Sequence, residues 1–165
     1  MDPNFPVPQK VMGAEMHFHN LAVDEVIQLG DVTVTSATLN HPGSATGYRV
    51  SYGGRSAAYV TDTEHCLGEL DANVLKLAKD ADLFIYDCTY TDDEYAHPTN
   101  GKTGWGHSTW QQGVQLAQAA GVKQLAIFHH DPSHDDAFMD EIARSAVDLF
   151  AGAIVAQEGK ICDLS

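Results

Sequence analysis

The sequence has few basic residues and few cysteines, and it contains no long apolar run. Nine Lys and Arg stand against 23 Asp and Glu, which gives a formal net charge of −14. Because such a chain repels phosphate backbones over long range, we expect nucleic acid to be an unlikely partner. No stretch of about 18 apolar residues is present, so we expect no membrane span.

The cysteines and the first residues both bear on location. Cys66, Cys88 and Cys162 are an odd number without a Cys-x-x-Cys pair, which favours reduced thiols and a cytoplasmic protein. The opening MDPNFPVPQK has no apolar core of an export signal. Its prolines break regular structure, so residues 1–15 are predicted to form an irregular connector.

Two glycine turns predict β-hairpins in the first third of the chain. Gly30-Asp31 and Gly53-Gly54 each lie between β-rich segments, which indicates two consecutive hairpins over residues 25–62. The histidines of His17-Phe-His19 share one side of a strand if the strand begins at Met16, and we interpret them as a sheet-surface pair.

Helices and apolar strands are predicted to alternate in the rest of the chain. The predicted segments are a helix over 72–81 capped by Asp71, a strand over 83–90, a loop over 91–106, a helix over 110–121 capped by Ser108 with Gln111, a strand over 125–130, a helix from Asp135 or Asp136 to Phe150, and a strand or hairpin over 153–164. This order predicts one α/β domain over residues 1–165, an α+β sandwich with helices on one face of the sheet.

Polar side chains follow several of the predicted strands. His41, Asp62, Asp87 and the pair His129-His130 stand at or just after strand ends. In α/β sheets, ligands bind at the carboxyl ends of strands, and His with Asp suits zinc, iron or manganese. Because these residues lie far apart in sequence, spacing leaves open both a shared metal site and separate loop residues.

Five segments in this order resemble metallo-β-lactamase-fold hydrolases, most closely the ribonuclease Z and phosphodiesterase branch. They are LNHPGSATGYRV, AAYVTDTEH, LFIYDCTYT, GWGHSTWQQGVQLAQAAG and VKQLAIFHHDP. The resemblance spans roughly residues 3–160 and implies the C-terminal αβ half of a four-layer αββα fold.

The resemblance also implies roles for single residues. It makes His41 a ligand of the first metal, Asp62 a bridge between two metals and His129 a ligand of the second. It makes His107 the group that contacts the scissile phosphate or protonates the leaving group, with Asp87 as its acidic partner. A carboxylate that accepts from one imidazole nitrogen orients the ring and favours its protonated form.

One departure from the family changes the expectation for this chain. The hallmark H-x-H-x-D-H segment, which supplies two ligands to each metal, is not found in the sequence. We therefore expect that an N-terminal αβ half, on the order of 100 residues or more, is missing. The chain alone should then bind metal weakly and expose an apolar face that packs against the missing half or drives self-association.

The remaining histidines and the tryptophans have plainer interpretations. His65, His97 and His134 are expected in solvated loops, and Cys66 and Cys88 as small core or loop residues. His130 is a weaker ligand candidate than His129, which directly follows LAIF.

For other residues two interpretations stay open. His41 has a loop role as its alternative, Asp62 a turn, His107 a helix cap and Asp87 a structural hydrogen bond. Trp105 and Trp110 either wall a substrate cleft or pack under the loop around His107.

The resemblance implies a metal-dependent hydrolase in the complete protein. Two divalent ions, zinc before manganese or iron, would hold a hydroxide that attacks a phosphodiester. The acidity of the chain favours a small-molecule or nucleotide-like substrate over RNA. The alternative is a truncated, non-catalytic module of the same fold used for binding or dimerisation.

Overall fold

A computed structural model of the protein describes residues 11, 13–18, 20–22 and 25–164. The elements in chain order are β1 (Val26–Leu29), β2 (Val32–Leu39), β3 (Ala45–Tyr52), β4 (Arg55–Val60), α1 (Ala72–Ala78), β5 (Leu83–Asp87), α2 (Asp92–Tyr95), α3 (Trp110–Ala120), β6 (Gln124–Phe128), α4 (Asp136–Leu149) and β7 (Ala153–Val155). The α/β class and both predicted hairpins are confirmed.

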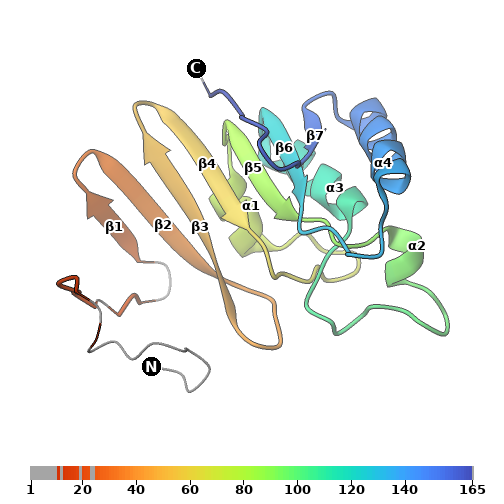
Figure 1. Ribbon diagram of the computed structural model, residues 1–165, viewed down its shortest axis with the longest axis horizontal. Helices are drawn as coiled ribbons and strands as arrows, with labels where there is room; N and C mark the ends of the chain where they lie inside the picture. The colour runs from red at the N-terminus through yellow and green to blue at the C-terminus, as the bar shows by residue number, and fades with distance from the viewer. Residues whose placement is uncertain (1–10, 12, 19, 23–24, 165) are drawn as a thin grey trace.

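The seven strands form one sheet whose spatial order follows the sequence, as Figure 1 shows. Strands β1 to β4 pair antiparallel, and β4 to β7 pair parallel. Two antiparallel steps separate β2 from β4, so these two strands run in the same direction. The carboxyl ends of β2, β4, β5 and β6 therefore share one edge of the sheet, where ligands bind in α/β proteins.

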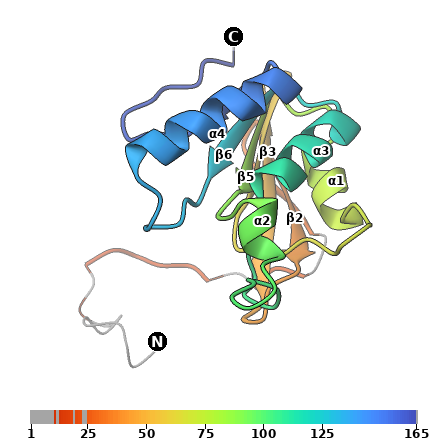
Figure 2. The ribbon, with the colours of Figure 1, turned by 90° about the vertical axis from the view of Figure 1, so that its right-hand side faces the viewer.

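The helices gather on one face of the sheet. Helix α1 packs on β2 to β4, α3 packs on β5 and β6, and α4 packs on α3 and the edge strand β7. Figure 2, which looks at the sheet from its β7 end, shows α1 and α3 on the same side of the strands. Alternate strand residues face these helices and form the core, among them Phe84, Tyr86, Leu125 and Ile127.

The opposite face of the sheet carries apolar side chains that no helix covers in the described part of the chain. Tyr59, Ile85, Ala126 and Ile154 pair in register across β4 to β7 and form one row on this face. Tyr59 is 44% exposed. A concavity of about 190 Å³ lies over these residues and is bordered by C-terminal residues such as Lys160 and Cys162. Ile85 and Ile154 are partly exposed and Ala126 is buried, so the predicted apolar face is only partly open to solvent in the described chain.

Local signals explain where the helices begin and end. The Asp71 carboxylate accepts from Asn73 N and Val74 N, which caps α1. Gly121 ends α3 in the left-handed conformation, with φ of 67°. The predicted cap of α3 by Ser108 with Gln111 is wrong, because Thr109 accepts from Gln112 N and caps the helix instead.

Two further predictions of local structure are wrong, and a third is confirmed in part. The segment 91–106 includes a one-turn helix, α2, which Thr91 and Glu94 stabilise through a capping box. The predicted C-terminal strand is present as the short β7, but residues 156–164 form no second strand of a hairpin. His17 lies in no strand and pairs with Glu15, while His19 lies outside the described residues.

The predicted connector and the predicted lack of a membrane span are tested only in part. Of residues 1–15, the structure describes 11 and 13–15, and none of these lies in an α-helix or a strand. Among the described residues, no helix has the length and apolar character needed to cross a bilayer.

Candidate metal-binding and catalytic site

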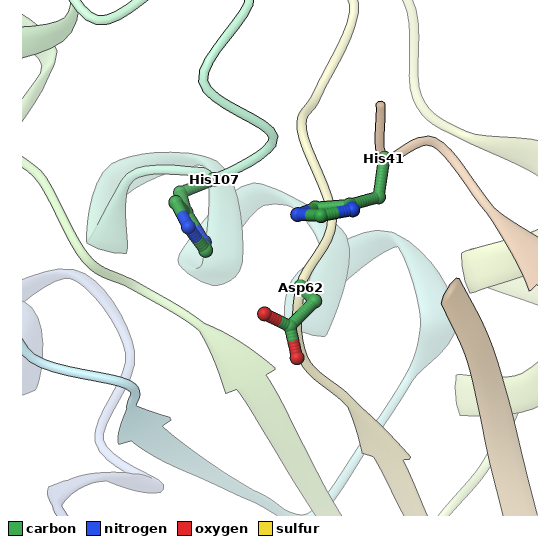
Figure 3. Close-up of side chains that lie close together, drawn as sticks. All are labelled: His41, Asp62 and His107. Atoms are coloured by element: carbon green, nitrogen blue, oxygen red, sulfur yellow. The ribbon is translucent and has the colours of Figure 1, made fainter. Parts of the chain in front are cut away.

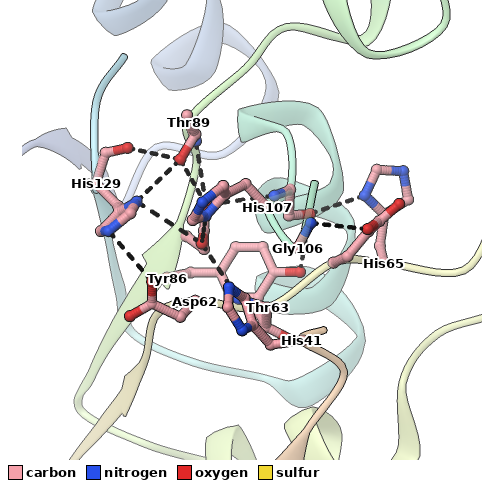
Figure 4. Close-up of polar contacts among 12 residues, drawn as sticks. His41, Asp62, Thr63, His65, Tyr86, Thr89, Gly106, His107 and His129 are labelled. Atoms are coloured by element: carbon pink, nitrogen blue, oxygen red, sulfur yellow. Dashed lines mark hydrogen bonds and ion pairs between the residues drawn. The ribbon is translucent and has the colours of Figure 1, made fainter. Parts of the chain in front are cut away.

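Four of the sequence-predicted side chains meet at the shared carboxyl edge of the sheet. His41 follows β2, Asp62 follows β4, Asp87 ends β5 and His129 follows β6. His129 Nε2 lies 3.7 Å from Asp62 Oδ1, and His129 Nδ1 lies 3.9 Å from Asp87 Oδ2. Figure 4 shows the contact between His129 and Asp62 together with His107, which reaches the same place from the loop before α3. Residues spread over most of the chain thus form one cluster.

Asp87 is the buried centre of this cluster. Its Oδ2 atom lies 2.9 Å from His107 Nδ1, and its side chain is fully buried. Its oxygens also accept the backbone N–H groups of Thr63, Thr89 and Ser108 and the hydroxyl of Thr89. Because a buried carboxylate needs such partners, this network fixes both Asp87 and the imidazole that it contacts.

His41 and His107 approach Asp62 from two different loops, as Figure 3 shows. His41 Nδ1 accepts the backbone N–H of Gly43 at 3.0 Å, which leaves Nε2 for other partners. The His41 ring lies against Gly106, where a β-carbon would stand only 2.3 Å from His41 Cδ2. Only glycine therefore fits at position 106 with His41 in place.

The side chains can hold a metal ion in two overlapping arrangements. In the first, potential ligand atoms of His41, Asp62 and His107 lie within 4.8 Å of one another, and in the second those of Asp87, His107 and His129 do. Imidazole and carboxylate are suitable ligands for zinc, manganese or iron. The donor set therefore fits a divalent transition metal.

His107 belongs to both arrangements, although the sequence assigned it to catalysis alone. His130 belongs to neither. Its Nε2 atom lies 3.1 Å from the carbonyl oxygen of Ala156, so it must donate there.

Two residues of the cluster have an unusual backbone conformation. Asp62 has φ of 57° and His129 has φ of 66°, in the left-handed region that non-glycine residues seldom adopt. Such strain is typical of functional sites, where the surrounding structure holds it.

Two sequence-based expectations for the other histidines are wrong. His65 is buried, and its Nδ1 lies 2.9 Å from Ser108 Oγ. Burial lowers the pKa of His65, although Asp92 and Glu64 partly oppose that shift. The His134 side chain is 5% exposed and contacts Glu94 at 2.8 Å. His97 is exposed, as predicted.

The two tryptophans differ in burial, and so do Cys66 and Cys88. Trp110 is buried in the core, whereas Trp105 is 58% exposed on the loop before His107. Lys102 Nζ lies 4.3 Å from the centre of the Trp105 ring. Cys88 is buried and Cys66 is exposed.

Sequence reasoning missed Thr89 and Glu64. The Thr89 hydroxyl lies 2.8 Å from Asp87 Oδ1 and 3.1 Å from His129 Nδ1, and Glu64 accepts three hydrogen bonds from around the His107 loop. The glycines of GWGH, which allow close approach of the backbone, are the one sequence signal for such a contact.

Comparison with known sequences matches the chain to a protein family and to relatives of about one-third identity. Residues 3–130 match the family model described as a beta-lactamase superfamily domain. Ribonuclease Z of Salinibacter ruber is 35% identical over 127 residues, which are 77% of this chain and 35% of that protein. Ribonuclease Z of Sulfurisphaera tokodaii is 33% identical over 67% of this chain and 33% of its own length. The chain thus spans about a third of these relatives.

Solved structures share the fold. The metallo-beta-lactamase fold protein YhfI of Bacillus subtilis superposes with a TM-score of 0.70 at 21% identity, over 85% of this chain and 53% of that one. The short form of human tRNase Z gives 0.61 at 19% identity, over 84% and 46%. A diphosphatase of the PhnP family gives 0.58 at 26% identity, over 88% and 47%. This chain therefore corresponds to about half of each solved neighbour.

Proposed function

Because the chain belongs to the beta-lactamase superfamily and has the fold of its metallo-β-lactamase members, we propose that the protein it forms hydrolyses a phosphodiester with bound divalent metal ions. The observation that carries this proposal is the buried Asp87–His107 pair beside His41, Asp62 and His129 at one edge of the sheet. The relatives named ribonuclease Z support the phosphodiester as the bond attacked.

His41, Asp62 and His129 are the proposed metal ligands. His41 presents Nε2 toward the cluster, and Asp62 lies between His41 and His129 with a side chain that is 48% exposed. A carboxylate in that position can coordinate one metal ion through each of its two oxygens. When bound, such ions supply a nucleophile from water at neutral pH and stabilise negative charge on the substrate. Zinc suits these donors best, with manganese and iron as alternatives.

His107 is the proposed proton donor and phosphate contact. Asp87 accepts at Nδ1 of His107, so a proton is held at that nitrogen and the ring is fixed in orientation. The Nε2 atom then faces the cluster, and the ring is about one-fifth exposed, so a substrate can reach it. A protonated imidazole there would stabilise charge on the phosphate or protonate the leaving oxygen.

The substrate class is proposed from the surroundings of His107. Lys102 and the exposed Trp105 offer a positive charge and an aromatic surface beside the site, which suit a phosphate and a nucleobase. The net charge of −14 favours a small nucleotide-like diester. The relatives named ribonuclease Z count in favour of RNA, so both substrates belong in the test.

The open apolar face is the proposed place for a second half-domain. The chain corresponds to about half of each solved neighbour, and no helix of the described residues covers the row through Tyr59, Ile85, Ala126 and Ile154. A sheet from a second half-domain packed there would bury this face and could add metal ligands.

The function is tested by joining this chain to an upstream half that carries H-x-H-x-D-H and loading the assembly with zinc or manganese. We expect turnover of a nitrophenyl phosphodiester, and its loss in an Asp62→Ala form. An assembled, metal-loaded protein that hydrolyses neither this diester nor a short RNA would favour the non-catalytic binding module.

A further inference from the structure

Glu64 is a buried carboxylate that reaches across to the loop before His107. Its Oε1 atom accepts the backbone N–H of Gly104 at 2.7 Å, and its Oε2 atom accepts that of Gly106 at 2.9 Å. The Tyr95 hydroxyl donates to Oε1 at 2.7 Å. One side chain thus holds Gly104 and Gly106, which lie three residues and one residue before His107.

His65, the next residue, fastens the other side of the same histidine. The Tyr86 hydroxyl donates to Ser108 Oγ at 3.0 Å, and His65 Nδ1 lies 2.9 Å from the same oxygen. The His65 ring lies against the Tyr95 ring, with centroids 4.4 Å apart. Glu64 and His65 therefore hold residues 104, 106 and 108, on both sides of His107.

We propose that Glu64 is a positioning residue for His107 and that His65 assists it. Together the two side chains form a clamp on the residues before and after His107. Both follow Asp62 in one short segment after β4. The segment would thereby fix the distance between Asp62, a proposed metal ligand, and His107, the proposed proton donor. Because Gly106 touches His41, displacement of the loop would disturb His41 as well.

The donors around Glu64 support this arrangement. The backbone N–H groups of Gly104 and Gly106 can only donate, and each points at a different carboxylate oxygen of Glu64. Burial and the contact with Glu64 raise the pKa of Tyr95 to about 12, so Tyr95 remains a donor. Charge-assisted bonds of this kind are stronger than neutral ones.

Substitution Glu64→Gln in the full chain tests the proposal by NMR. The amide of glutamine points an N–H group at backbone N–H groups, so at least one bond to the loop is lost. We expect hydrogen exchange at Gly104 and Gly106 to accelerate roughly tenfold or more. We also expect the signal of the His107 Nδ1 proton shared with Asp87 to weaken or vanish. Glu69→Gln, on the same segment and exposed, is the control and should change neither.

Each other outcome overturns the proposal. Unchanged hydrogen exchange at Gly104 and Gly106 would show that Glu64 does not hold the loop before His107. Faster exchange with an intact His107–Asp87 proton signal would make Glu64 a support of the loop only. If Glu64→Gln does not fold, Tyr95→Phe removes one bond to Glu64, and wild-type signals in it would contradict the clamp.

The inference rests on the proposed function for the role of His107. The hydrogen exchange of Gly104 and Gly106 and the His107 Nδ1 proton signal are measured without substrate or metal. A failed hydrolysis assay with an intact clamp would therefore count against the function alone, and a failed clamp with normal hydrolysis would count against this inference alone.

Discussion

His107 Nδ1 lies 2.9 Å from Oδ2 of Asp87, a carboxylate with no solvent exposure that also accepts three backbone N–H groups. One aspartate therefore ties together the ends of β4, β5 and the loop before α3. Its loss should affect stability and the proposed chemistry together.

Asp87→Asn should destabilise the chain by about 1–3 kcal/mol, because an amide N–H₂ group would face donors that now have an acceptor. Urea unfolding measures this loss. Asp31→Asn, in the exposed Gly30-Asp31 turn, is the matched control and should stay within about 0.5 kcal/mol of the wild type. Equal stability of the two variants would show that the Asp87 network contributes little.

Gly106→Ala should move His41, because the added β-carbon would stand 2.3 Å from Cδ2 of that ring. Gly104→Ala is a close control, since its φ of 84° matches the 86° of Gly106 and no atom lies within 4 Å of its added β-carbon. Both variants carry the left-handed strain of about 1–2 kcal/mol. Only Gly106→Ala should also weaken zinc binding by the assembled protein in calorimetry, and equal affinities would argue against His41 as a ligand.

Stability should fall in acid as Asp82 becomes protonated. Hydrogen bonds from Lys123, Ser56 N and Arg55 lower the pKa of Asp82 to about 2, against an ordinary 3.8. Between those values the unfolded chain binds the proton and the folded chain does not, so the stabilisation present above about pH 4 is lost toward pH 2. Asp82→Asn should flatten this part of the stability–pH curve. Asp80→Asn, two residues away and exposed, should leave it in place.

Trp105→Ala should weaken binding of a nucleotide-like diester by about 1–3 kcal/mol, the usual effect of removing a stacking aromatic. In the assembled enzyme this should raise KM with little change in kcat. Tyr52→Ala is the control, because Tyr52 is also exposed but lies at the end of β3, at the opposite edge of the sheet. A nitrophenyl substrate without a base should be affected less than a nucleotide.

Much of the fold could be predicted from the sequence because its signals are local. Gly30 and Gly53 mark hairpin turns, Asp71 caps a helix and Gly121 ends one, and each acts through its own backbone. The edge that gathers His41, Asp62, Asp87 and His129 could also be anticipated, because each residue ends or follows a predicted strand.

The errors arise where a distant contact decides the outcome. Ser108 has the right residue type for a helix cap, but its hydroxyl is engaged by His65 and Tyr86, so Thr109 takes the role. His65 follows three polar residues, so the sequence predicts that its side chain is exposed to solvent. In the structure, Tyr95 and Ser108 cover it. Neither partner can be identified without knowing how the segment after β4 meets the loop before α3.

The chain alone should retain less than one zinc ion per molecule after gel filtration. His41, Asp62 and His107 offer three donors, whereas a closed zinc site commonly uses four. Metal analysis of the eluted protein measures this. Tight, stoichiometric zinc in the chain alone would contradict the proposal that a second half-domain completes the site.

The proposed metal-dependent hydrolysis is tested by comparing phosphodiester turnover in two proteins: the metal-loaded assembly of this chain with an H-x-H-x-D-H half, and its Asp62→Ala form. Asp62 lies close to both His41, which follows β2, and His129, which follows β6. We expect the assembly to be active, the chain alone to be inactive, and Asp62→Ala to abolish turnover. Full activity of Asp62→Ala, or turnover by the chain alone, would contradict this expectation.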